Sequence, residues 1–284
     1  MNGIYWRMSF ALVLIAVAAM AGNLSSEKPR AWHVVSRRPA TSRDTAFVDR
    51  HKLLTEPEDP TNAPGPGSFR LLSVKAPEHT RAVVLLDQRT GDSTVLAKSG
   101  TMPRFSPDGR FVAFSLWKSR ERPWNLVILD RKTGRLIEPP LGGRVSAYKR
   151  WSPDGKWLAI QSNPSSRGRC RLGLVAVPSG SVRWADSLDV FADYEFGWSP
   201  NSRNLAVARP ERVDQHAEEI LSADLWIISD RGRVRCLLDS TSDYVARDPK
   251  WVTDSTLLVE KGQPGDDPEA AAARVLLQIR GGRP

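Results

Sequence analysis

Residues 105–114 read Phe105-Ser106-Pro107-Asp108-Gly109-Arg110-Phe111-Val112-Ala113-Phe114, an aromatic residue and a polar turn followed by an apolar run. The pattern returns three times, with growing departures, as Trp151-Ser152-Pro153-Asp154-Gly155-Lys156, Trp198-Ser199-Pro200-Asn201-Ser202-Arg203 and Trp251-Val252-Thr253-Asp254-Ser255. The leading aromatic residues are 46, 47 and 53 residues apart. A recurrence of this kind is typical of a repeat protein.

Each copy predicts a tight turn between two strands. Proline at the second turn position presets φ, aspartate can bond the turn backbone, and glycine accepts a positive φ. The residues with these roles are Pro107, Asp108, Gly109, Pro153, Asp154, Gly155 and Pro200. The aromatic residue before each turn can fill the wedge between neighbouring repeats, and these residues are Phe105, Trp151, Trp198 and Trp251. The motif therefore indicates structure rather than catalysis.

A second motif runs in phase with the first, as an apolar strand that ends near a glycine turn. Its five copies are Val83-Val84-Leu85-Leu86-Asp87, Leu126-Val127-Ile128-Leu129-Asp130, Leu174-Val175-Ala176-Val177, Leu225-Trp226-Ile227-Ile228-Ser229 and Val275-Leu276-Leu277-Gln278-Ile279. A repeat of about 40–50 residues with four strands matches the blade of a β-propeller, which must stack on its neighbours. The sequence predicts an all-β propeller of about five four-stranded blades, within a range of four to six.

The repeated unit, with Asp224-Leu225-Trp226-Ile227 further on, resembles the TolB-type, WD-like propeller repeat of bacterial envelope proteins. The resemblance covers roughly residues 68–284, and the sequence departs from it at Asn201-Ser202 and Val252-Thr253. It implies a propeller in the cell envelope that binds other proteins. TolB carries an additional α/β domain, for which the repeat region leaves no room.

The chain divides into three predicted parts. Residues 1–21 resemble a cleaved signal peptide, because their apolar run from Met8 to Ala18 is too short to span a membrane comfortably. An uncleaved membrane anchor is the alternative. Residues 22–67 form a polar, Pro-rich lead-in, in which Thr45–Leu54 could be a strand that closes the ring. Residues 68–284 form the propeller, with a helical segment expected only at Val213–Leu221.

Export shapes the expected partners. The predicted location is periplasmic or extracytoplasmic, with attachment to the membrane by the N-terminal segment as a variant. The net charge of +9 could attract anionic lipid or cell-wall surfaces, while export argues against nucleic acid as a partner. Cys170 and Cys236 could form a disulfide in an oxidising compartment or remain two buried thiols. A monomeric ring is expected.

The sequence offers little chemistry for an enzyme. It contains no Gly-x-Ser-x-Gly elbow and no phosphate-binding glycine loop, and its four histidines are isolated. An acidic patch, Asp266, Asp267 and Glu269, is interpreted as a solvated loop rather than a calcium site, since prolines flank it. The sequence predicts no catalytic residue, no metal and no cofactor.

Polar residues gather where the inner strand of each blade begins, at the predicted mouth of the channel. The candidate binding residues are Tyr148, Lys149, Asp193, Tyr194, Glu195, Asp243, Tyr244, Arg247 and Asp248. We expect an exported, non-enzymatic module that binds an envelope protein or a cell-wall glycan there. One alternative is a small glycan hydrolase, which would need Asp193, Glu195 and Asp248 to converge to about 5–10 Å. Another is a degenerate relative of a sensor or peptidase propeller.

Overall fold

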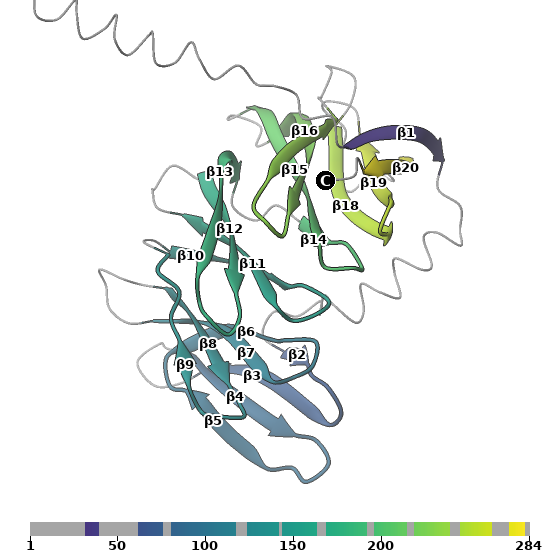
Figure 1. Cartoon of the computed structure of the whole chain (residues 1–284). Helices are drawn as coiled ribbons and strands as arrows, with labels where there is room; N and C mark the ends of the chain where they lie inside the picture. The colour runs from purple at the N-terminus through teal and green to yellow at the C-terminus, as the bar shows by residue number, and fades with distance from the viewer. Residues whose placement is uncertain are drawn as a thin grey trace, which may run out of the picture. The chain divides into compact units, whose positions relative to one another are not determined.

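The computed structural model describes residues 32–39, 62–75, 81–117, 124–141, 144–163, 169–191, 196–214, 219–238, 245–262 and 273–281. All regular secondary structure in these ranges is β-strand, numbered β1 to β20 (Figure 1). None of the described residues forms an apolar helix long enough to span a bilayer. Residues 32–281 make up one compact unit.

The first three blades are separate antiparallel sheets of four strands (Figure 1). Blade 1 contains β2 (Asn62–Pro64), β3 (Phe69–Lys75), β4 (Arg81–Asp87) and β5 (Ser93–Ala97). Blade 2 contains β6 (Gly100–Phe105), β7 (Phe111–Leu116), β8 (Asn125–Asp130) and β9 (Leu136–Ile137). Blade 3 contains β10 (Arg144–Trp151), β11 (Trp157–Asn163), β12 (Arg169–Ala176) and β13 (Val182–Phe191). The order of pairing within each blade follows the order of the sequence.

The last two blades are joined by a single parallel pair, Ala223 with Val245, into one eight-stranded sheet. Blade 4 contains β14 (Phe196–Trp198), β15 (Asn204–Asp214), β16 (Glu219–Ser229) and β17 (Val234–Leu238). Blade 5 contains β18 (Val245–Thr253), β19 (Thr256–Gly262), β20 (Ala273–Gly281) and, as its fourth strand, β1 (Trp32–Pro39). The described strands thus confirm the predicted all-β propeller of five four-stranded blades.

The structure corrects three details of the sequence analysis. Blade 1 begins at Asn62, inside the predicted lead-in, because β2 pairs with β3 as the inner strand. The fourth strand of blade 5 comes from β1, upstream of Thr45–Leu54, and that segment lies outside the described residues. The prediction of a helix at Val213–Leu221 is wrong for the part of this segment that the structure describes. Its ends belong to a β-hairpin that pairs Val213 with Ile220.

Each pair of consecutive blades shares an apolar cluster, so stacking buries the two faces that one blade alone would expose. Between blades 1 and 2 the cluster includes Leu71, Val83 and Phe114. The other three clusters are built in the same way and contain, from blade 2 onward, Ile128 with Ile160, Leu174 with Phe196, and Leu225 with Leu257. The core of the described chain is therefore a series of interfaces.

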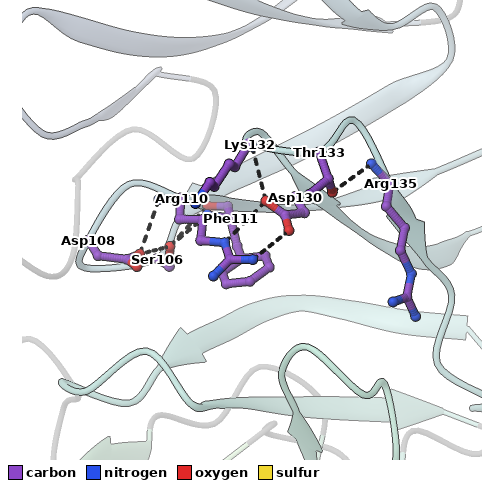
Figure 2. A network of polar contacts seen from close by, with 8 residues as sticks. All are labelled: Ser106, Asp108, Arg110, Phe111, Asp130, Lys132, Thr133 and Arg135. Atoms are coloured by element: carbon purple, nitrogen blue, oxygen red, sulfur yellow. Dashed lines mark hydrogen bonds and ion pairs between the residues drawn. The ribbon is translucent and has the colours of Figure 1, made fainter.

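The structure shows the motif turn of blade 2 in atomic detail (Figure 2). The Ser106 Oγ hydroxyl donates to Asp108 Oδ1 at 2.5 Å, and the Arg110 amide donates to the same carboxylate at 3.1 Å. The Arg110 guanidinium then binds Asp130 through two hydrogen bonds, of 3.2 Å and 2.8 Å (Figure 2). This charge-assisted bonding lowers the pKa of Asp130 to about 2. The basic residue after the turn thus connects the first turn of the blade to the second.

The repeated tryptophans link each blade to the one before it. The Nε1–H group of Trp151 donates to the Arg104 carbonyl at 3.4 Å, and that of Trp198 donates to the Arg150 carbonyl at 3.1 Å. Trp251 donates in the same way to the Gly197 carbonyl at 3.0 Å. Each acceptor is the residue just before the aromatic position of the preceding blade. The aromatic position therefore adds a hydrogen bond to the packing expected from the sequence.

The motif turns also contact one another. The Asn201 amide donates to Asp254 Oδ1 at 2.8 Å, and the Asp154 amide donates to Ser202 Oγ at 2.9 Å. Ser202 stands where two earlier copies have glycine, and it keeps a left-handed φ of 62° beside 69° for Gly155. Ser202 departs from the motif, and its hydroxyl supplies a hydrogen bond between blades 3 and 4.

Replacing Ser202 should separate these two effects. Ser202→Ala keeps the left-handed backbone strain and removes the acceptor for Asp154, so we expect a loss of about 1–2 kcal/mol in the free energy of unfolding. Ser202→Gly also removes the acceptor but relieves the strain, so its loss should be smaller by about 0.5–1 kcal/mol. Urea denaturation at neutral pH measures both values. Equal losses for the two variants would contradict the strained conformation.

Candidate functional site

Each blade has two different ends. At one end, which we call the turn end, motif turns join the first strand to the second and the third to the fourth, as in the network of Asp108 and Asp130 (Figure 2). At the opposite end, the loop end, the chain connects the second strand to the third and passes to the next blade. Of the predicted binding residues on described strands, Arg247 and Asp248 lie in the half of β18 nearer the loop end, whereas Tyr148 and Lys149 lie in the half of β10 nearer the turn end.

The inner strands share a local irregularity at this place. The pairing of β6 with β7 shifts between Thr101 and Arg104, and that of β18 with β19 shifts between Arg247 and Lys250. β10 shows a shift between Val145 and Lys149. Two of these bulges contain an X-Pro pair, Met102-Pro103 and Asp248-Pro249, and proline cannot donate a hydrogen bond to the ladder. Such bulges re-aim side chains and are frequent beside binding sites.

The predicted residues fall into three groups. Lys149 is fully described and follows the bulge of β10 directly. Tyr148, Arg247 and Asp248 lie in or beside the bulges of β10 and β18, and their side chains lie outside the described part of the chain. Asp193, Tyr194, Glu195, Asp243 and Tyr244 lie outside the described residues altogether. The convergence of Asp193, Glu195 and Asp248 required for a glycan hydrolase thus stays a prediction.

Lys149 is the unusual member of the set, because its side chain is buried. Only 4% of the residue is exposed, and Nζ donates to the Ser115 hydroxyl of blade 2 at 2.9 Å. Burial, together with the smaller effect of the positive charge of Arg104, lowers the pKa of Lys149 to about 7. An ionisable side chain with so perturbed a pKa marks a candidate functional position.

Sequence reasoning missed the residues that surround Lys149. Ser115 and Ser162 end the apolar runs of β7 and β11, and both are buried, with 2% and 1% exposed. Arg104 directly precedes the aromatic Phe105. The available signal was a hydroxyl at the end of an apolar strand in two successive blades, which an analysis centred on the motif turns did not consider.

Two further expectations concern metal and cysteine chemistry. The part of the chain that the structure describes has no group of three or more His, Cys, Asp or Glu side chains able to hold a metal ion. The acidic patch of Asp266, Asp267 and Glu269 lies outside that part. Cys170 is buried and Cys236 is half-buried, and the described structure shows no disulfide between them.

Several solved structures share this architecture. The propeller domain of the Trilobed protease from Pyrococcus furiosus matches with a TM-score of 0.54 and 15% identity, over 78% of this chain and 68% of that chain. The acylaminoacyl peptidase of Pyrococcus horikoshii matches with a TM-score of 0.54 and 14% identity, over 84% of this chain and 40% of that chain. TolB from Acinetobacter baumannii matches with a TM-score of 0.47 and 21% identity, over 68% and 46%.

The fold is a β-propeller. No family model and no curated protein sequence matches the chain significantly. The chain spans 46% of the TolB chain and 40% of the peptidase chain. At these levels of identity the likeness establishes the fold alone, and the activities and partners of the longer proteins do not follow from it.

Proposed function

We propose that this chain is an exported, non-enzymatic propeller that binds a protein of the cell envelope through the loop end of its inner strands. The observation that carries the proposal is the recurrence of a bulge on the inner strands of blades 2, 3 and 5. Each bulge lies two to five positions before a blade aromatic, where the sequence also places its polar and tyrosine residues. Repetition of a bulge at one position indicates a common role in presenting side chains.

The contrast between the two ends supports this assignment. At the turn end the motif residues bond to one another within and between blades, as Asp130 does with Arg110 and Asp154 with Ser202. Those side chains are engaged in holding the fold. Beside their bulges, the inner strands of blades 3 and 5 carry Tyr148 and Arg247, residue types that are enriched at protein interfaces. An apolar N-terminal segment of the signal-peptide type is consistent with export.

The proposal is tested by comparing variants of the two ends. The full chain, carrying a C-terminal affinity tag, is used to capture proteins from a bacterial envelope extract. A loop-end variant combines Tyr148→Ala, Tyr244→Ala and Arg247→Ala. A turn-end variant combines Arg89→Ala and Lys132→Ala, two exposed residues in motif turns. Both variants must match the unmodified chain in circular dichroism and melting temperature.

We expect one dominant protein in a stoichiometric amount, retained by the turn-end variant and lost by the loop-end variant. The purified partner should then bind the unmodified chain in solution, with an affinity that the loop-end changes reduce at least tenfold, a loss of about 1.4 kcal/mol or more. Equal loss from both variants would place the interaction elsewhere. Capture of no protein would contradict the proposal and favour a glycan ligand.

A further inference from the structure

The interface between blades 2 and 3 contains a polar cluster, which we call the Lys149 cluster: Arg104, Ser115, Lys149 and Ser162. Ser115 and Ser162 are next to last on strands that end at the loop end. Ser115 lies on the same face of β7 as Ala113, and Ser162 on the same face of β11 as Ile160. Ala113 and Ile160 both belong to the apolar cluster that these two blades share. The hydroxyls of Ser115 and Ser162 are thus directed into one interface from opposite sides.

The two basic members of the cluster face the same interface. Lys149 pairs with Ile160 and reaches Ser115 with its amino group, at 2.9 Å. Arg104 pairs with Ala113 in blade 2, and its charge acts on Lys149. Side chains of directly opposed residues lie on one face of an antiparallel sheet. Arg104 and Lys149 therefore bring two like charges together between the blades.

The cluster has a polar group left over. The Ser162 hydroxyl oxygen is buried and has no hydrogen-bond partner among the described residues. Lys149 has three donor positions, and the described structure shows one of them in use, toward Ser115. Among the described residues, Arg104 is the charged residue that acts on Lys149, and no described carboxylate does so. A buried amino group next to an unsatisfied hydroxyl, with no described carboxylate acting on it, is suited to an anion.

We propose that the Lys149 cluster binds a carboxylate from an acidic segment of the protein partner. The inference rests on the proposed docking at the loop end and specifies the chemistry of what docks there. A carboxylate would accept hydrogen bonds from Lys149 and from the Ser162 hydroxyl, and its charge would stabilise the ammonium form of Lys149. The net charge of +9 favours an acidic partner before contact is made.

The experiment uses a blocked penta-glutamate peptide as the probe and its penta-glutamine counterpart as the reference. Binding to the full chain is measured by calorimetry at low and high salt. The Lys149 cluster variant is Lys149→Met, and the matched control is Lys156→Met, a solvent-exposed lysine in the motif turn of the same blade. A folded chain is verified for each variant by circular dichroism.

We expect the glutamate peptide to bind and the glutamine peptide not to bind. Lys149→Met should weaken binding at least about tenfold, and this difference should persist at high salt because a buried pair is little screened. Lys156→Met should leave the affinity within about twofold at high salt, as expected for an exposed charge. Equal effects of the two changes would show attraction to the general surface charge and would overturn the proposal.

A second readout follows Lys149 itself. In a chain labelled with carbon-13 at lysine Cε, the Lys149 signal is assigned by its absence from Lys149→Met, and its pKa is followed with and without peptide. A bound carboxylate should raise this pKa by at least about one unit, because it stabilises the ammonium form. No change would overturn the proposal. A lower pKa of Lys149 in the Asp193→Asn or Glu195→Gln variant, measured without peptide, would also overturn the proposal. The chain's own carboxylate would in that case occupy the cluster.

The outcomes separate the two proposals. If an envelope protein is captured through the loop end but its binding is the same for Lys149→Met and the unmodified chain, the docking function stands and the carboxylate site fails. If the peptide binds through Lys149 and no envelope protein depends on the loop end, the site stands as an anion site and the docking function fails.

Discussion

Lys149→Met is expected to stabilise the protein at pH 6 by a few kcal/mol. The folded chain holds this lysine at a pKa of about 7, whereas an exposed lysine has its ordinary value of 10.5. Below pH 7 the amino group is charged in both states, and the folded state bears the full penalty of burying it. Methionine has nearly the same length and carries no charge, so the penalty disappears in the variant.

The gain should shrink as the pH rises. Between about pH 7 and 10.5 the unfolded chain binds a proton at Lys149 that the folded chain has released, so the free energy of unfolding rises with pH for the unmodified protein. The difference between Lys149→Met and the unmodified chain, measured by urea denaturation from pH 6 to 10, isolates this group from all others. Lys156→Met, whose side chain is 75% exposed, serves as the control and should show no such trend. A constant difference across the range would contradict the buried charge.

Trp198→Ala is expected to lower the free energy of unfolding by about 3–5 kcal/mol. The side chain is 9% exposed and packs in the cluster between blades 3 and 4 with Phe196 and Leu174. Its removal leaves a cavity at the junction of two blades, where the surrounding strands are held by their own ladders and cannot collapse into the space. The change also removes the donor that reaches the Arg150 carbonyl.

Two companion variants divide this loss into its parts. Trp198→Phe keeps most of the packing and removes the donor, so we expect a loss of about 1–2 kcal/mol. Trp117→Ala removes a tryptophan that is 36% exposed at the end of β7, and its loss should stay within about 1 kcal/mol. Denaturation followed by circular dichroism compares all three. A loss from Trp198→Ala as small as that from Trp117→Ala would show that the blade junction does not depend on the repeated aromatic residue.

The fold could be predicted because the repeat specifies it at several levels. The proline and glycine of the motif set turn conformations locally, and the spacing of the aromatic residues gives the period of the blade. Where the motif is degenerate the prediction weakened. The shortened turn of blade 1, at Pro64-Gly65-Pro66-Gly67, has the composition of a linker. The sequence therefore predicts a lead-in where the structure has β2. The apolar spacing around Val213 also suits a helix, but the pairing with β16 determined a strand.

The candidate site could be predicted only in part. Inner-strand polar residues were identified from their position before each aromatic, and Lys149 among them proves to be buried. Its contact with Ser115 joins residues from two blades that are 34 positions apart, and no local pattern specifies which side chains meet across a blade junction. The burial that perturbs Lys149 is likewise a property of the stacked blades. The sequence therefore indicated the place but not its electrostatics.

The pairing of β1 with β20 has a consequence for how the chain acquires its structure. Trp32 pairs with Gly281, so the fourth strand of the last blade is synthesised before every other described strand, and its partner after all of them. Contacts this distant along the chain form slowly, because a large loop must close before they contribute any stability. The earlier blades can form from neighbouring segments while β20 is still absent. The exposed edge of β20 is then covered only at the final stage, when the N-terminal segment returns to it, and an interruption of synthesis before that point would leave β1 without its partner.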